Sequence, residues 1–181
     1  VNVPDLEVNL SGGGDITSEI NTDKLNCNIS GGGDADIDGN IKNYNLSLSG
    51  GGDLESDVKT SNIDCSIAGG GDCTIRAKDK TGEVRISMSG GGDIILDMNV
   101  EKIQIAVSGG GDATLTGQAP RLEIAMSGGG NVNAGKFLTE YTSFNVSGGS
   151  DVHVSASKEL IGNISGGGDV YYSGNPVDVN I

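Results

Sequence analysis

The motif Ser-Gly-Gly-Gly-Asp, with close variants, recurs along the whole of the 181-residue chain. Successive copies are separated by 19, 19, 19, 21, 19, 19, 20 and 18 residues. Repetition at a nearly constant period is typical of a solenoid, in which each repeat forms one coil and neighbouring coils bury each other's inner faces. The first residues of the nine copies are Ser11, Ser30, Ser49, Ala68, Ser89, Ser108, Ser127, Ser147 and Ser165.

Apolar and polar residues alternate on both sides of the motif. In nearly all copies, apolar residues occupy the positions one, three and five before the first residue of the motif. In the first copy these are Leu10, Val8 and Leu6. After the aspartate the alternation resumes, for example with Ile94 and Leu96. A period of two places one set of side chains inside and the other outside, which is the pattern of a β-strand. No stretch shows a convincing helical period.

Each repeat therefore predicts two short strands, a glycine corner between them, and a second, more variable turn such as NTDK or GQAP. A coil of this size cannot bury its inner face alone, so the coils must stack about 4.8 Å apart as parallel strands. Parallel crossovers are almost always right-handed. We predict an all-β, single-domain right-handed parallel β-helix over residues 1–181, with about nine coils of about 19 residues.

The glycines need a geometric reason, because glycine loses more backbone freedom on folding than any other residue. We expect every corner to require positive φ angles. We also expect no room for side chains between stacked corners.

The charge of the chain excludes two classes of partner. There are 25 acidic residues against 11 basic ones, a formal net charge of −14, which repels nucleic acid and anionic lipid. No run approaches the ~20 apolar residues of a transmembrane helix. Strand-like alternation starts at Val1 rather than a charged n-region and an apolar h-region, so any signal peptide would have preceded Val1.

The aspartates that end the motifs form a column. We interpret them as turn caps, whose carboxylates accept hydrogen bonds from backbone N–H groups at the corner. Calcium is the alternative, although calcium-binding repeats have a nine-residue period. We expect no cofactor and no metal site, and the best candidates for a cation site lie on the outer face of the first coils. These candidates are Asp34, Asp36, Asp38, Asp53, Glu55 and Asp57.

Catalytic machinery is not apparent in the sequence. A nucleophilic serine needs a neighbouring base, and the only histidine is His153, which has outward parity. Arg76 and Arg85 are the basic residues nearest the acidic columns, and we interpret their parity as wrong for a shared cleft. We therefore expect no enzymatic activity.

The cysteines and aromatic residues are interpreted as core or cap. Cys27, Cys65 and Cys73 are expected to be buried free thiols, because Cys27 and Cys65 lie two coils apart. Phe144 and Tyr172 have inward parity and are expected to close the end of the rod. The candidate ligand contacts are Tyr141, expected in a loop, and Tyr171, which points outward.

The repeated corner and its flanking alternation resemble the auto-transporter adhesin head GIN domain family of exported bacterial proteins. The resemblance covers nearly the whole chain, including the final SGGGDVYYSGNPVDVNI. The usual corner of that family is S-G-S-G-D, whereas the middle serine is glycine here, and SGGSD occurs at residues 147–151. The resemblance implies a right-handed β-helix and a periplasmic or cell-surface location, often behind a lipoprotein-type signal. On that basis we expect membrane association only through a lipid anchor upstream of Val1. The resemblance implies no catalytic or ligand residues.

Together these features predict a non-enzymatic exported module of the cell envelope or surface. We expect an adhesin that binds a glycan, a protein or an envelope component through its flat β faces. A calcium-binding or purely structural spacer domain is the alternative, and a polysaccharide-active enzyme is less favoured. We expect no nucleic-acid partner, and a homo-oligomer would be an ordinary remedy for open sheet edges.

Overall fold

The computed structural model describes residues 3–181, apart from the side chain of Lys78. These residues form a solenoid of parallel β-strands, and the described part of the chain has no helix that could cross a membrane. The strands are β1 (Val3–Leu10), β2 (Ile16–Ile29), β3 (Ala35–Leu48), β4 (Leu54–Lys59), β5 (Asn62–Ile67), β6 (Cys73–Met88), β7 (Ile94–Val107), β8 (Ala113–Gly128), β9 (Val132–Gly148), β10 (Val152–Ser155), β11 (Glu159–Gly166), β12 (Val170–Ser173) and β13 (Asp178–Asn180).

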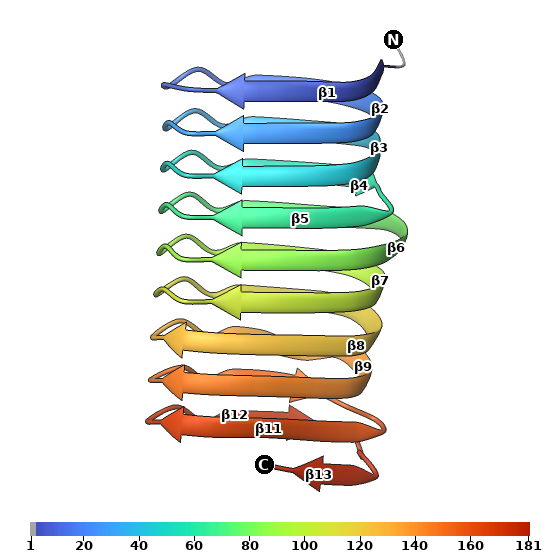
Figure 1. Ribbon diagram of the computed structural model, residues 1–181, viewed down its shortest axis with the longest axis vertical. Coiled ribbons are helices and arrows are strands. Elements are labelled where there is room, and N and C mark those ends of the chain that lie inside the picture. The colour runs from blue at the N-terminus through green and yellow to red at the C-terminus, as the bar shows by residue number, and fades with distance from the viewer. Residues whose placement is uncertain (1–2) are drawn as a thin grey trace.

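The coils stack in the register that the repeat predicts. Leu48 pairs with Ile67, and Ile67 pairs with Met88, so each residue before a corner lies on its equivalent in the next coil. In Figure 1 the chain runs from right to left along the near face, turns at the glycine corners, and returns along the far face as it descends. This is the path of a right-handed coil. The predicted parallel β-helix of about nine coils is confirmed.

Two surfaces of the solenoid recur below. The entry face consists of the strand segments that lead into each corner, such as β5, and the exit face of the segments that leave it, such as β4. Coils are numbered by their corners, from coil 1 at Ser11 to coil 9 at Ser165. The edge opposite the glycine corners is called the turn edge.

The expectation of two short strands per coil is wrong for most coils. β2, for example, runs unbroken from Ile16 to Ile29 through the NTDK segment. The reason is that stacked coils keep their backbone hydrogen bonds while the chain bends at the turn edge, so the ladder does not stop there. Within residues 16–166, the strand is interrupted at this edge only at Thr60–Ser61, between β4 and β5, and at residues 156–158, between β10 and β11.

The corner glycines are explained by close stacking rather than by φ. Of the corner glycines in residues 3–181, only Gly12, Gly148 and Gly166 have positive φ, at 108°, 115° and 141°. The expectation of positive φ at every corner is therefore wrong. A Cβ on Gly31 or Gly50, each the first glycine of its corner, would overlap the carbonyl oxygen of the preceding coil. The coils approach so closely that no side chain fits between them there.

The middle glycine of each corner is different. A Cβ built on any of these residues has no other atom within 4 Å, so the expectation of no room holds for only part of the corner. The third glycine is crowded like the first, although Ser150 occupies that position in coil 8 and donates its hydroxyl to the carbonyl of Gly128 at 3.0 Å.

The core consists of inward columns of aliphatic side chains. Two irregular positions complement each other. Gly162 replaces the apolar residue of its column because the ring of Phe144 already fills the space that a side chain there would need. Phe144 is 4% exposed, which agrees with its predicted inward position. Tyr172 shares the inward column of Val154 and is 50% exposed in the terminal strand β12, so its role in closing the rod stays a prediction.

All three cysteines are buried and free, as the sequence predicts. Burial raises the pKa of the Cys27 thiol to about 11. The thiols of Cys65 and Cys73 share a hydrogen bond across the core, which together with burial keeps the pKa of Cys73 well above its usual value. Neutral thiols of this kind act as small apolar groups.

Candidate functional site

The aspartates at the corners form a continuous hydrogen-bonded ladder along the rod. The Oδ1 atom of Asp53 accepts the backbone N–H of Asp72 at 2.8 Å, and the Oδ1 atom of Asp72 accepts the N–H of Asp93 at 2.8 Å. The same bond links every consecutive pair from Asp15 to Asp169. The carboxylates therefore cap backbone N–H groups at the corner, but the N–H belongs to the next coil. They join coils to one another.

We expect Asp72→Ala to lower the free energy of unfolding by about 1 kcal/mol, because the N–H of Asp93 loses its acceptor. Asp72→Asn should change stability much less, since Asn131 occupies the same column and accepts the N–H of Asp151 at 3.1 Å. Urea unfolding of the three proteins measures the difference. Equal losses for both variants would show that the negative charge matters, not the acceptor.

The acidic candidates lie together on the exit face of coils 2 and 3. Asp36 pairs in register with Glu55, and the Oδ1 atom of Asp38 accepts the backbone N–H of Asp57 at 3.0 Å. Asp34 and Asp53 belong to the corner ladder beside them. Among the described residues, no group of three or more histidine, cysteine, aspartate or glutamate side chains is arranged to hold a metal ion. The expectation of no metal site, with calcium as the alternative, stays a prediction, tested by melting the protein in chelator and in millimolar calcium.

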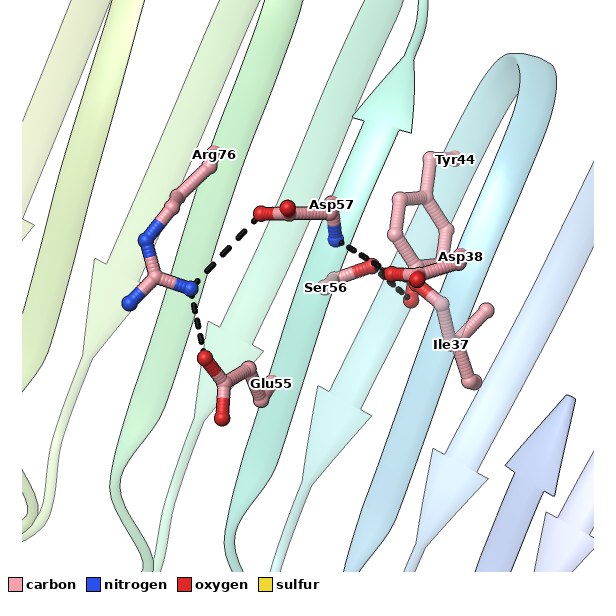
Figure 2. A network of polar contacts seen from close by, with 7 residues as sticks. All are labelled: Ile37, Asp38, Tyr44, Glu55, Ser56, Asp57 and Arg76. Carbon is pink, nitrogen blue, oxygen red and sulfur yellow. Dashed lines mark hydrogen bonds and ion pairs between the residues drawn. The ribbon is translucent and has the colours of Figure 1, made fainter. Parts of the chain in front are cut away.

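Arg76 lies among these carboxylates, so the parity expected for it is wrong. It pairs in register with Asp57, and its Nη1 atom lies 2.5 Å from Glu55 Oε1 and 3.6 Å from Asp57 Oδ1 (Figure 2). The hydrogen bond with Glu55 is the main reason that the pKa of Arg76 is raised. Arg76 thus neutralises part of the acidic face, and Arg85 lies on the entry face instead.

A polar contact lies in the core beneath this face. Ser56 is fully buried and donates its hydroxyl to the carbonyl of Ile37 at 2.5 Å, while its Oγ lies 3.3 Å from the hydroxyl of buried Tyr44 (Figure 2). Burial is the main reason that the pKa of Tyr44 is raised. These hydroxyls satisfy one another and the backbone inside the core, which indicates a structural role.

Tyr171 is exposed on the exit face of coil 9, as its outward parity predicts. Its ring stacks on His153 with centroids 4.6 Å apart, and 52% of its surface is exposed. The nearby carboxylate of Asp169 is the main cause of a raised pKa for its hydroxyl. His153 covers one face of the Tyr171 ring, and because β12 is the last strand on this side, the other face can pack against another flat group. The stacked pair is called the Tyr171 platform below.

Tyr141 is not in a loop, as expected, but inside β9. Its half-buried ring has Arg121 Cζ at 5.3 Å and Lys158 Nζ at 5.5 Å from the ring centroid. Both cations therefore contact its π system. The ring of Tyr141 is therefore less accessible to a ligand than the ring of Tyr171. The structure does not bring the two tyrosines together, since they lie on different faces.

Two grooves on the turn edge were not predicted from the sequence. Coil 5 has two extra residues, and the register of β6 against β7 shifts between Ala77 and Thr81. Lys80, in this longer turn, lines a groove of about 620 Å³ on one side and one of about 500 Å³ on the other. The spacing of 21 residues at this coil was the signal that could have indicated a projecting turn.

The chain matches a known protein family. The sequence model of the family described as "Putative auto-transporter adhesin, head GIN domain" matches residues 1–82 and again residues 76–176. The two matches together span nearly the whole chain. No curated protein and no solved structure matches the chain.

Proposed function

Since the chain belongs to the auto-transporter adhesin head GIN domain family, we propose that it is a non-enzymatic binding module of the cell envelope or surface. The family name describes an adhesin head, which is an exported, surface type of protein. We propose that this module recognises a glycan or another envelope component on its exit face. A rigid rod with flat, repeated faces is suited to display and adhesion.

The observation that carries this proposal is the platform of Tyr171 on His153. Half of the Tyr171 surface faces solvent on a flat strand face, with its ring held by the stack against His153. An aromatic ring offers a large apolar face at a small cost in conformational entropy, and it can pack against the C–H groups of a sugar ring. Asp169 and Asp151, whose charges raise the Tyr171 pKa, supply hydrogen-bond acceptors beside it.

The contacts of the reactive side chains support binding over catalysis. Ser108 and Ser147 donate their hydroxyls to main-chain carbonyls of the preceding coil, at 3.3 Å and 3.1 Å. Within the described part of the chain, neither serine forms a hydrogen bond with His153, whose ring is stacked on Tyr171. A hydrolytic site of this type would need a serine hydroxyl within hydrogen-bond reach of the histidine that acts as its base.

We further propose a periplasmic or outer-surface location with a lipid anchor upstream of Val1, in keeping with the family's exported character. The net charge of −14 keeps such a rod soluble and away from anionic lipid headgroups.

The test is binding to an array of bacterial envelope polysaccharides and free glycans, with Tyr171→Ala and Tyr141→Ala as a matched pair. We expect the wild type to bind and Tyr171→Ala to lose about tenfold in affinity, which is roughly 1.4 kcal/mol. Tyr141→Ala should bind nearly as well as the wild type. Release of reducing ends from any bound polysaccharide would contradict the non-enzymatic role. Failure of the wild type to bind any glycan or isolated envelope fraction would favour the spacer alternative.

A further inference from the structure

The entry face of coils 5 to 7 carries a column of very small side chains. Ser87, Ala106 and Ala125 are all exposed and lie on one another in register. They line two adjoining shallow hollows on this face, of about 570 Å³ and about 480 Å³. Because these side chains are so short, another flat surface can approach this sheet closely.

Charged residues flank the small column in a pattern that reverses along the rod. Four residues before the corners, the column reads Arg85, Gln104 and Glu123 from coil 5 to coil 7. Six residues before the corners, the next column begins with Glu83 in coil 5 and ends with Arg121 in coil 7. The first column therefore changes sign across the neutral Gln104 of coil 6. The second changes sign one step earlier, because its coil 6 residue is Lys102.

This reversal makes the face complementary to itself. We propose that a second copy of the chain binds here, through a two-fold axis that lies in the interface parallel to the entry strand of coil 6. The two rods are then antiparallel, and each column meets the same column with its coil order reversed. Arg85 lies over Glu123 of the partner subunit, Glu83 over Arg121 of the partner subunit, and Ala106 meets its own equivalent on the axis.

Other placements of the axis are less favourable. An axis at coil 5 would place Arg85 against Arg85 of the partner subunit. An axis at coil 7 would place Glu123 against Glu123 of the partner subunit, so in both cases like charges would meet. A parallel pair of rods that packs the two small columns together leaves Arg85 and Glu123 facing corner serines. In the antiparallel arrangement the one meeting of like charges is at Lys102, whose Nζ is already paired with Glu123 Oε1 at 2.9 Å in its own chain. Like charges without such a partner oppose association.

The available area suits a dimer. The entry face of coils 3 to 9 covers about 700 Å² at the usual strand spacings, close to the ~800 Å² per partner of a standard interface. At its margin the same axis brings Lys24 of coil 2 to Asp178, which follows coil 9, adding a further pair of opposite charge. Ile161, which is 44% exposed, would also be covered. The proposal does not depend on the glycan hypothesis, because the Tyr171 platform lies on the opposite face.

The primary test is the mass in solution, measured by light scattering after gel filtration from 5 to about 500 µM. We expect a mass of twice 18.2 kDa for the wild type. Arg85→Glu and Glu123→Arg should each raise the dissociation constant by at least about tenfold. The double variant R85E/E123R should restore the dimer, because opposite charges meet again. Lys136→Glu, an equal change of charge on the exit face, is the control and should leave the mass unchanged.

A second measurement covers the case in which a charge reversal disturbs folding. A106C places a thiol on the two-fold axis, so mild oxidation should link two chains. A125C, with the same change in the same column, should not link, because its two copies would lie two coils apart, about 9.6 Å along the rod. A monomeric wild type at all concentrations would overturn the proposal. So would a dimer that is unaffected by the reversals, or equal cross-linking of A106C and A125C.

Discussion

Gly69→Ala is expected to lower the free energy of unfolding by about 3 kcal/mol, whereas Gly70→Ser changes it by less than about 0.5 kcal/mol. The two glycines are neighbours in one corner, and the sequence pattern alone does not distinguish them. They differ in what a Cβ meets. On Gly69 it overlaps the carbonyl oxygen of Gly50, which belongs to the stacked backbone, and on Gly70 it meets nothing within 4 Å.

The overlap at Gly69 cannot be relieved by turning a side chain. The N–H of Ala68 donates to Leu48 O at 2.7 Å, and the N–H of Gly70 donates to Gly50 O at 3.0 Å, so hydrogen bonds fix the spacing of the coils on both sides of the substitution. Separating the coils would weaken these bonds. Thermal and urea unfolding of the two variants give the comparison. Similar stabilities would mean that the corners are held apart farther than the structure indicates.

The pair Phe144 and Gly162 is expected to give the second large effect. Phe144→Ala should destabilise the protein by about 3–5 kcal/mol, because the ring fills its own position and also the empty position of Gly162 in the next coil. Gly162→Leu alone should also destabilise by about 3 kcal/mol, since the new side chain would overlap the ring.

The double variant F144L/G162L should recover much of the loss, because it restores an ordinary aliphatic column. Ile105 and Ile124, which precede Phe144 in that column, show what the regular packing requires. Unfolding free energies for the two single variants and the double variant form a cycle, and we expect a favourable coupling of about 1–3 kcal/mol. Additive losses would show that the ring and the glycine do not share one space. Leu138→Ala, at an exposed position, is the control.

The repeat was sufficient to predict the architecture. A constant period with inward residues at fixed offsets from the corner allows few arrangements, and residues such as Leu48 and Ile67 lie in register as their offsets require. The position of Arg76 was also accessible, since it follows its corner aspartate by four residues, as Asp57 does.

Other features depend on distances that a pattern of residue types does not contain. Tyr141 seemed to lie in a loop because the turn edge is variable in sequence, but the ladder of backbone hydrogen bonds continues through it. The grooves beside Lys80 depend on how far the longer turn of coil 5 projects. The acceptor role of the aspartates was predictable, whereas the donor, in the next coil, follows only from the stacking distance.

Because there is open space beside the middle glycine of every corner, the corner edge can carry side chains at regular intervals. Nine positions, one per coil, follow one another at about 4.8 Å, and each is free to carry a side chain without disturbing its neighbours. Chemical groups attached there would be spaced by the backbone itself, in a straight row of known pitch. A polymer or receptor array with a matching repeat would then bind several of them at once, and avidity would grow with the number of coils rather than with the strength of any single contact.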